Sequence, residues 1–336
     1  MGAFEQIGVF AGQSAVIFIF IAALIVLIAI LVAKSAHKNE LQVETLNDHF
    51  DQQSQQIKAL IMTDDEWKTE KKKLKEKMKS QAKESKSKVY VIHFNGSMNA
   101  HEVESLREEV TAILSTATHQ DEVVVCLESP GGVVHGYGLA ASQLLRIRNK
   151  GIPLTICVDK VAASGGYMMA ATGNKILAAP FAIVGSVGVI AQVPNFHRLL
   201  KKYDVDYKEY TAGEFKRTVS LLGEITEKGE EKFKEQLEDT HQLFKNFIHH
   251  LRPHLDLSKV ATGEYWYGEQ ALKLGLIDGI QTSDDYLLGQ ATQKKIVKIK
   301  FEKKQPFSEK LSGILGKAIS RAALRTVDEL ELRRLP

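Results

Sequence analysis

A serine in a glycine-rich turn is the first residue of this sequence that could carry out chemistry. Ser164 stands in the run ASGGY (163–167), a few residues after the apolar run LTICVD and just before the small-residue run MMAATG. This order places the hydroxyl at or near the start of a predicted helix, where partial positive charge favours a developing oxyanion. Taken alone, the same order also fits a simple helix N-cap.

A second glycine-rich turn, SPGG (129–132), directly follows the apolar run VVVCLE (123–128). Paired glycines let the backbone approach a substrate closely and expose amide N–H groups, which suits an oxyanion hole. Considered singly, this turn is more typical of an ordinary connection between a strand and a helix. The two turns are more informative together, because one supplies a nucleophile and the other supplies hydrogen-bond donors.

A serine of ordinary pKa is a weak nucleophile and needs a general base. None of the eleven histidines stands out as a partner for the serine turn. A lysine can replace histidine when desolvation lowers the pKa of its amine enough to leave a neutral fraction near neutral pH. Lys160 and Lys175 flank the serine motif and are typical of exposed turns. The residues alone leave open which lysine is the base.

The apolar runs that precede these turns predict a parallel sheet. Residues 89–94, 123–128 and 154–159 read as buried strands, and residues 102–115 and 139–148 between them read as helices. Alternating strands and helices are typical of βαβ units whose sheet is covered on both faces, so the predicted class is α/β. A further uncharged stretch, Ile176–Val193, is interrupted by Pro180 and glycines, and we expect a buried strand-turn-strand rather than a membrane span.

The N-terminus predicts one transmembrane helix. Residues 15–33 contain no charge, amide or proline, and a helix of that length would be about 28 Å long, close to the hydrocarbon thickness of a bilayer. A cleaved signal peptide is the alternative, but no Lys or Arg precedes the apolar run. Residues 1–14 form a short flank before this helix, and residues 34–88 read as a lysine-rich stalk, solvated or in contact with anionic lipid.

Composition excludes several classes of protein. The net charge of +3 is small and the lysines are concentrated in the stalk, so we expect no nucleic-acid partner. The two cysteines, Cys126 and Cys157, both lie in apolar runs that read as strands, which argues against a disulfide framework or a zinc site. Acyl transfer by a serine with a lysine base would also require neither a metal nor an organic cofactor, so we expect none.

Five segments together resemble the signal peptide peptidase A family of serine peptidases. They read LESPGG (127–132), DKVAASGGYMMAATGNKILAAP (159–180), IVGSVGVI (183–190), TAGEFKR (211–217) and TGEYWYGEQALKLGLIDGI (262–280). The resemblance covers about residues 89–285, and implies a peptidase domain at 89–300 with a ClpP/crotonase-like spiral of βαβ units. Residues 301–336 would follow it as an amphipathic helical tail. The implied activity is that of a serine endopeptidase acting on membrane-associated peptides or proteins, such as remnant signal peptides.

The same resemblance implies a role for each site residue. Ser164 matches the nucleophile of a Ser-Lys dyad, Lys216 matches its general base, and Ser186 matches a hydroxyl that orients the lysine amine. The oxyanion would lie against the backbone N–H groups of Gly131 and Gly165. Because longer family members draw serine and lysine from different halves, this chain would form a homo-oligomer in which neighbouring subunits share each site.

Two questions stay open at this point. Lys34 and Lys38 follow the predicted membrane helix while only Glu5 precedes it, which favours a cytoplasmic body; the resemblance instead implies a periplasmic catalytic domain on the bacterial inner membrane. The alternative functions are a crotonase-like acyl-CoA hydrolase or isomerase, which would also surround a carbonyl with two amides, and a catalytically silent membrane scaffold.

Overall fold

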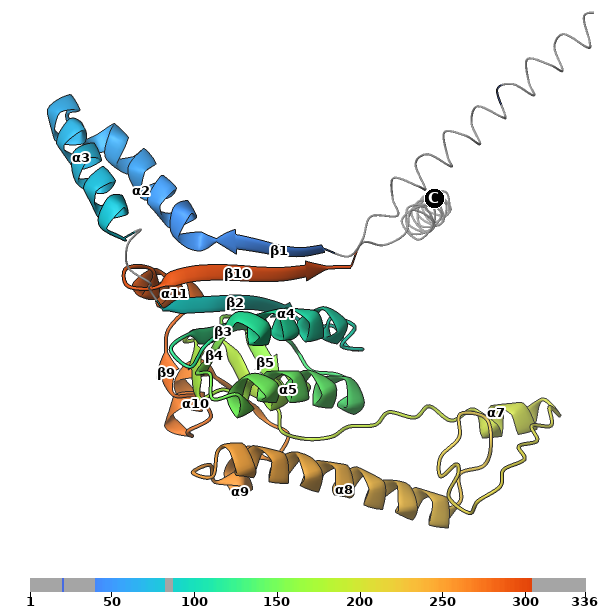
Figure 1. Ribbon diagram of the computed structural model, residues 1–336. Helices are drawn as coiled ribbons and strands as arrows, with labels where there is room; N and C mark the ends of the chain where they lie inside the picture. Colours follow the sequence, from blue (N-terminus) through green and yellow to red (C-terminus); the bar gives the residue numbers. More distant parts are fainter. Residues whose placement is uncertain (1–19, 21–39, 82–86, 304–336) are drawn as a thin grey trace, which may run out of the picture. The chain divides into compact units, whose positions relative to one another are not determined.

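The computed structural model describes Phe20, residues 40–81 and residues 87–303 (Figure 1). Apart from Phe20, the predicted transmembrane helix lies outside these residues, as does nearly all of the predicted tail 301–336. Among the helices that are described, none combines the length and the apolar character needed to cross a membrane. The chain divides into two units, of which the larger, Gln42–Lys300, contains both glycine-rich turns.

A seven-stranded sheet forms the centre of the larger unit, in the order β1-β10-β2-β3-β4-β6-β9 (Figure 1). From β10 to β9 every neighbouring pair is parallel. The α/β prediction is therefore confirmed, and the three predicted strands are present. The strands are β1 (Glu40–Thr45), β2 (Lys88–Asn95), β3 (Glu122–Glu128), β4 (Leu154–Val158), β6 (Lys175–Ala178), β9 (Gly279–Ile280) and β10 (Lys295–Glu302).

Both faces of this sheet are buried, which explains why its strands are continuous apolar runs. Ile92 and its neighbours on one face join a large core with helices α4 (Val103–Thr116), α5 (Val134–Asn149) and α6 (Gly165–Ala170). Val91 and Val124 point to the opposite face and join a smaller core with Tyr286 of α11 (Ser283–Ala291). Side chains of successive strand residues thus serve two separate cores.

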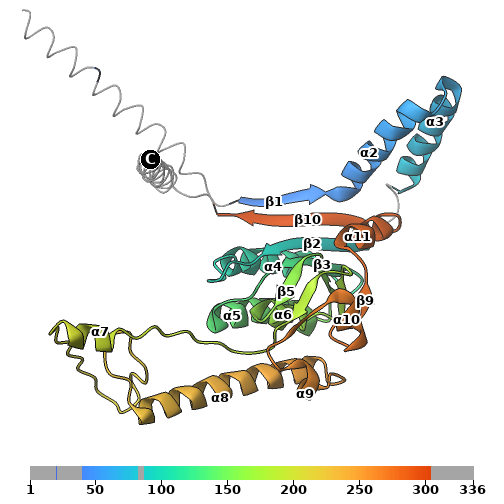
Figure 2. The same ribbon diagram turned by 180° about the vertical axis from the view of Figure 1, so that it is seen from behind.

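A second sheet of three short strands carries the serine turn. It consists of β5 (Val161–Ala163), β7 (Ile183–Gly185) and β8 (Tyr265–Tyr267), with β5 parallel to β7 and β7 antiparallel to β8. The uncharged stretch Ile176–Val193 is confirmed as a strand-turn-strand, because it contains β6 and β7. Figure 2 shows β5 beside α5 and α6, far from the edge of the main sheet that β1 and β10 form.

The segment expected to be a stalk begins at the edge of the main sheet. After β1 it forms helices α2 (Leu46–Ile61) and α3 (Asp64–Gln81). Asn47 fastens its start to the sheet: the side-chain amide donates to the carbonyls of Ala291 and Lys294, both at 3.1 Å, and its oxygen accepts from the Ile296 N–H at 2.7 Å. The first turn of α2 is therefore part of the folded body.

Helix α8 (Glu227–Leu251) lies on the same side of the sheet as α5 and α6 in both views (Figures 1 and 2). Between β7 and α8 the chain forms a long segment with only one short helix, α7 (His197–Lys202), and Figure 1 shows this segment reaching the N-terminal end of α8. The remaining helices are α9 (Leu257–Val260) and α10 (Gly268–Lys273).

An ion pair between the buried Arg252 and the more exposed Asp278 holds the C-terminal end of α8 to the sheet. Arg252 donates two hydrogen bonds to Asp278, at 2.6 and 3.2 Å, and Asp278 also accepts from the N–H of Ile176 in β6 at 2.7 Å. Burial opposes ionisation of the carboxyl, but these hydrogen bonds outweigh burial and hold the pKa of Asp278 below its ordinary value. Asp278 thus links the C-terminal end of α8 to β6, in addition to the packing of Phe244 and Ile248 in the large core.

We predict that Asp278→Asn destabilises the protein by about 2 kcal/mol in urea unfolding at pH 7, less than the ~3–5 kcal/mol for breaking a fully buried pair, because Asp278 keeps some contact with water. Since the pKa of Asp278 is lowered in the folded state, its contribution is complete above the ordinary carboxyl pKa of about 4 and is lost as the pH falls below that value. The difference between variant and wild type should therefore shrink in acid.

The matched control is Glu230→Gln, which removes a carboxylate from the exposed pair with Lys234 on the same helix. Its stability should equal that of the wild type, because exposed pairs on helices contribute little. If both variants unfold at the same urea concentration, or if the effect of Asp278→Asn grows in acid, the ion pair does not hold α8 in this way.

Candidate active site

Ser164 sits in a strained turn between β5 and α6. Its φ is 52° and its ψ is −119°, a conformation that glycine adopts freely and that costs other residues on the order of 1–3 kcal/mol. Its N–H donates to the carbonyl of Gly185 at 2.8 Å, which continues the pairing of β5 with β7 and holds the turn in place. The side chain is half-buried. Hydrolases of other folds hold a nucleophilic serine in a similarly sharp turn between strand and helix.

The two glycines after Ser164 are required by close packing. A Cβ on Gly165 would lie 2.4 Å from Cγ of Tyr137, and a Cβ on Gly166 would lie 2.6 Å from the carbonyl oxygen of Ser129. Both distances are shorter than any real contact of a Cβ atom, so α6 can begin here only with glycine. The packing explains why the serine is followed by two glycines.

The two glycine-rich turns are in direct contact. A Cβ built on Gly131 would lie 2.7 Å from Cβ of Ser164 and 2.8 Å from the backbone nitrogen of Gly165. Gly131 also has a φ of +87°, which favours glycine on conformational grounds. The contact is fixed because Ser129 pairs with β5: its N–H donates to Val161 at 2.8 Å and its carbonyl accepts from Ala163 at 3.0 Å.

The two predicted oxyanion donors differ in their hydrogen bonding. Gly165 is the first residue of α6, and an N–H in the first turn of a helix has no acceptor within the helix. The N–H of Gly131 instead donates to Oγ of Ser129 at 3.1 Å. It would have to leave this hydroxyl in order to bind an oxyanion.

Ser186 lies next to Ser164 although 22 positions separate them in the sequence. Ala163 at the end of β5 pairs with Gly185 at the end of the parallel strand β7, so the two serines that follow are neighbours. Ser186 also has a positive φ, 53°, and its N–H donates to the carbonyl of Glu264 at 2.6 Å. The structure therefore brings together four of the five predicted residues: Gly131, Ser164, Gly165 and Ser186.

Lys216 is the exception, because its exposed side chain lies on the segment between α7 and α8. The two residues before it anchor this turn to the first turns of α8: Glu214 forms an ion pair with Lys228, and the ring of Phe215 lies 5.6 Å from the ammonium groups of both Lys228 and Lys232. Nothing described for this chain joins Lys216 to Ser164 by a hydrogen bond.

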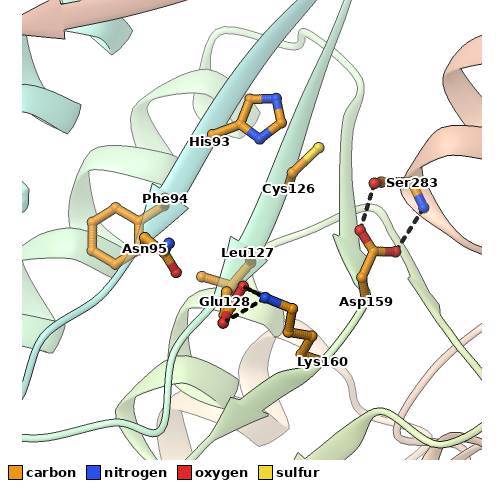
Figure 3. Close-up of a pocket in the computed structure, with 9 residues that line it drawn as sticks. All are labelled: His93, Phe94, Asn95, Cys126, Leu127, Glu128, Asp159, Lys160 and Ser283. Carbon is orange, nitrogen blue, oxygen red and sulfur yellow. Dashed lines mark hydrogen bonds and ion pairs between the residues drawn. The ribbon is translucent and has the colours of Figure 1, made fainter.

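The two rival lysines are engaged elsewhere. Nζ of Lys160 binds both carboxylate oxygens of Glu128, at 2.9 and 3.2 Å, as Figure 3 shows. Nζ of Lys175 lies 5.4 Å from the ring centre of Tyr286, on the side of the smaller core. Both lysines therefore have partners other than Ser164 among the described residues.

A small cavity of about 120 Å³ opens at the carboxyl ends of β2, β3 and β4, and its lining includes His93, Cys126 and Asp159 (Figure 3). Cys126 belongs to the smaller core, so the cavity faces away from α5 and α6. Burial, together with Lys298, lowers the pKa of His93, and burial raises the pKa of Cys126 to about 12. Asp159 is held by the N–H and hydroxyl of Ser283 at 2.8 and 2.5 Å. The lining also includes Glu128 and Lys160, which directly precede the SPGG turn and β5 in the chain.

Two buried hydroxyls beneath the turns were missed by the sequence reasoning. Ser129 and Tyr137 are both fully buried, and their oxygens lie 2.5 Å apart. The only signal in the sequence is a tyrosine on the apolar face of the helix that follows the SPGG turn. In the part of the chain that the structure describes, no cluster of three or more His, Cys, Asp or Glu side chains could hold a metal ion.

Comparison with known proteins identifies relatives along nearly the whole chain. Residues 3–144 match the family described as "Peptidase family S49 N-terminal", and residues 146–297 match "Peptidase family S49". "Probable protease SohB" of Haemophilus influenzae is 50% identical over 285 residues, 81% of each chain. "Putative protease SohB" of Buchnera aphidicola subsp. Baizongia pistaciae is 40% identical over 333 residues, 94% of this chain and 93% of its own.

One solved structure, a membrane-bound stomatin-specific protease in complex with a substrate peptide, is 18% identical, and the match covers 61% of this chain and 80% of that one. Its TM-score is 0.35, which is too low to support an inference. The sequence relatives confirm the resemblance that the five segments indicated.

Because Ser164 is strained, the stability difference between a glycine and an alanine variant should have opposite signs at position 164 and at an exposed helix position. Ser164→Gly should be more stable than Ser164→Ala by about 1 kcal/mol, because glycine adopts the positive φ without strain. Ser142, exposed on helix α5, is the control: there the glycine variant should be about 1 kcal/mol less stable than the alanine variant. Thermal unfolding of the four variants measures both differences. Equal stabilities of the two variants at position 164 would mean that the turn is unstrained.

Proposed function

This chain belongs to peptidase family S49 and is a peptidase, and we propose that it is a serine endopeptidase with Ser164 as nucleophile and Lys216 as general base. The observation that carries the proposal is the contact between the two glycine-rich turns. It places a strained, accessible serine beside two backbone amides, and that combination suits acyl transfer. The adjacent Ser186 supplies a second hydroxyl on the same edge.

In the proposed mechanism the neutral amine of Lys216 accepts the proton of Ser164 while Oγ attacks the scissile carbonyl. The hydroxyl of Ser186 accepts a hydrogen bond from the amine and orients it. Collapse of the tetrahedral intermediate breaks the C–N bond, and the ammonium returns the proton to the leaving amine. Water then hydrolyses the acyl-enzyme, again with the lysine as base. The proposal requires no metal or organic cofactor.

The oxyanion would be held by the N–H groups of Gly165 and Gly131. Gly165 needs no rearrangement, because its N–H begins a helix. Gly131 would exchange the neutral hydroxyl of Ser129 for the charged oxygen. A charged acceptor forms a hydrogen bond roughly twice as strong as a neutral one, so the exchange is favourable once the intermediate forms.

We propose that the lysine reaches the serine from a neighbouring subunit of a homo-oligomer. Lys216 lies on an exposed segment whose turn is anchored to α8 rather than to the serine turn. The longer stretch from β7 to α8, which contains this segment, also exposes many large apolar side chains, a pattern typical of protein interfaces. They are Ile190, Val193, Phe196, Leu199, Tyr203, Val205, Tyr207, Tyr210, Phe215 and Leu221.

The proposed substrates are membrane-associated peptides or proteins, such as remnant signal peptides. The support is the apolar segment 15–33, which is long enough to anchor the chain in a bilayer. By resemblance we place the catalytic domain on the periplasmic side of a bacterial inner membrane; Lys34 and Lys38 oppose this placement under the positive-inside rule.

The dyad is tested with purified full-length protein and a fluorogenic peptide library. Ser164→Ala and Lys216→Ala should each lower kcat/KM by at least about 10³-fold, as removal of a nucleophile or base does in other serine hydrolases. The wild-type rate should rise with pH, because only the neutral amine accepts a proton. Lys208→Ala, which removes another exposed lysine of the same segment, should keep full activity. Undiminished activity of Ser164→Ala would refute the proposal.

Shared sites predict complementation between inactive variants. Subunits with Ser164→Ala and subunits with Lys216→Ala, co-expressed and purified as mixed oligomers, should regain about a quarter of the wild-type activity, because each intact residue is present in half of the subunits of a symmetric ring. The unmixed variants, prepared in parallel, provide the baseline. If no activity returns in oligomers proven to be mixed, both residues of a site come from one subunit.

A further inference from the structure

We propose that Ser129 and Tyr137 are positioning residues of this site, which hold the backbone of Gly131 and Gly165 against the Ser164 turn through a buried pair of hydroxyls and the tyrosine ring. The inference rests on the proposed role of Ser164 and extends it to two residues that no substrate can reach. Both side chains have no exposed surface. They would therefore act only through the backbone of the two turns.

The first support is a chain of hydrogen bonds with a defined direction. The hydroxyl of Tyr137 donates its only proton to the carbonyl of Ser97 at 2.9 Å. The hydroxyl of Ser129, 2.5 Å away, must therefore donate to the tyrosine oxygen. This leaves the oxygen of Ser129 free to accept the N–H of Gly131 at 3.1 Å. The resting position of the Gly131 backbone thus depends on the hydroxyl of Tyr137, and its N–H turns from Ser129 to the oxyanion when the intermediate forms.

The second support is that Tyr137 also contacts the second amide. Its Cγ, Cβ and Cδ2 atoms would lie 2.4–2.8 Å from a Cβ on Gly165, so the ring lies directly against the backbone that carries this N–H. One side chain thereby supports Gly131 through its hydroxyl and Gly165 through its ring. A shift of the ring would move both amides relative to Oγ of Ser164.

The third support is the close approach of the Gly96 backbone to the two hydroxyls. A Cβ on Gly96 would lie 2.5 Å from the hydroxyl oxygen of Tyr137 and 2.8 Å from Oγ of Ser129. Any side chain at position 96 would therefore displace the hydroxyl pair. Burial also raises the pKa of Tyr137, so its hydroxyl stays protonated across the basic range in which a lysine base works.

A buried hydroxyl pair needs an explanation, because two apolar side chains of similar shape could fill the same space. Unpaired buried hydroxyls are costly and paired ones contribute little net stability. What the pair provides here is a fixed place for the Gly131 backbone beside Ser164. A backbone that is already in place limits the movement that its N–H must make while the oxyanion forms.

The test compares Tyr137→Phe and Ser129→Ala with wild type, in the full-length protein. Tyr137→Phe keeps the ring against Gly165 and removes only the hydroxyl, and Ser129→Ala removes the acceptor of Gly131. Both should lower kcat by about tenfold or more, less than the ~10²–10³-fold for loss of an oxyanion donor itself. KM for a peptide that the wild type cleaves should stay within about twofold, because loss of an interaction made in the transition state lowers kcat and kcat/KM equally.

A peptide aldehyde with the sequence of the cleaved peptide provides the decisive readout, because it forms a tetrahedral adduct with serine. Its affinity should fall by the same factor as kcat. Tyr286→Phe is the matched control: it removes the hydroxyl of another buried tyrosine, which binds Glu122 on the opposite face of the sheet. This variant should keep wild-type kcat and aldehyde affinity even if its melting temperature falls as far as that of Tyr137→Phe.

The inference is overturned if Tyr137→Phe and Ser129→Ala keep or exceed the wild-type kcat, or if they lose activity only in proportion to the unfolded fraction measured by thermal melting. Ser164→Ala in the same assay distinguishes failure of the positioning role from failure of the proposed function. If Ser164→Ala is inactive while both hydroxyl variants are normal, only the positioning role fails. If Ser164→Ala is active, the proposed function fails with it. Should Tyr137→Phe not fold, Ser129→Ala alone decides the outcome.

Discussion

The close approach of Gly131 to the Ser164 turn is the contact on which the site depends. It exists because Ser129 pairs with β5, and β5 in turn pairs with β7. The glycines of the two turns are required at this contact, because a Cβ on any of them would clash with neighbouring atoms. The strain at Ser164 and the neighbouring position of Ser186 both follow from these pairings, since each serine continues a strand whose register is already set.

The proposed base is positioned by different interactions. The turn that carries Lys216 is anchored to the N-terminal end of α8 through Glu214 and Phe215, and the other end of α8 is tied to β6 through Arg252 and Asp278. The proposed nucleophile and the proposed base thus lie on separate parts of the subunit, each held by its own contacts. This separation is the reason for proposing a site assembled from two subunits.

The two faces of the main sheet differ in their chemistry. The face toward α5 and α6 adjoins the serine turn. The opposite face carries two thiols whose pKa values are raised by burial, the lysine that lies over Tyr286, and the cavity lined by His93. Because burial keeps Cys126 and Cys157 protonated, neither is suited to act as a nucleophile. The proposed nucleophile therefore lies on the side of the sheet away from both thiols.

Much of the fold could be predicted from the sequence by itself. Strands β2, β3 and β4 are buried on both faces and so appear as continuous apolar runs, and the turns SPGG and ASGGY appear as glycines because their packing admits no side chain. The sequence thereby determined the α/β class and pointed to Ser164. It did not choose Lys216 by physical reasoning, since an exposed lysine in an irregular segment has no distinguishing pattern; a family resemblance supplied that residue.

Only the tertiary structure decided which residues meet. Strands β5 and β7 have three residues each, too few for any periodic signal, yet their pairing places Ser164 beside Ser186. The hydrogen bonds among Ser97, Tyr137 and Ser129 join residues up to 40 positions apart. Contacts between distant positions depend on how the elements pack, and the local pattern of a sequence records only that a residue will be buried, not what it will touch.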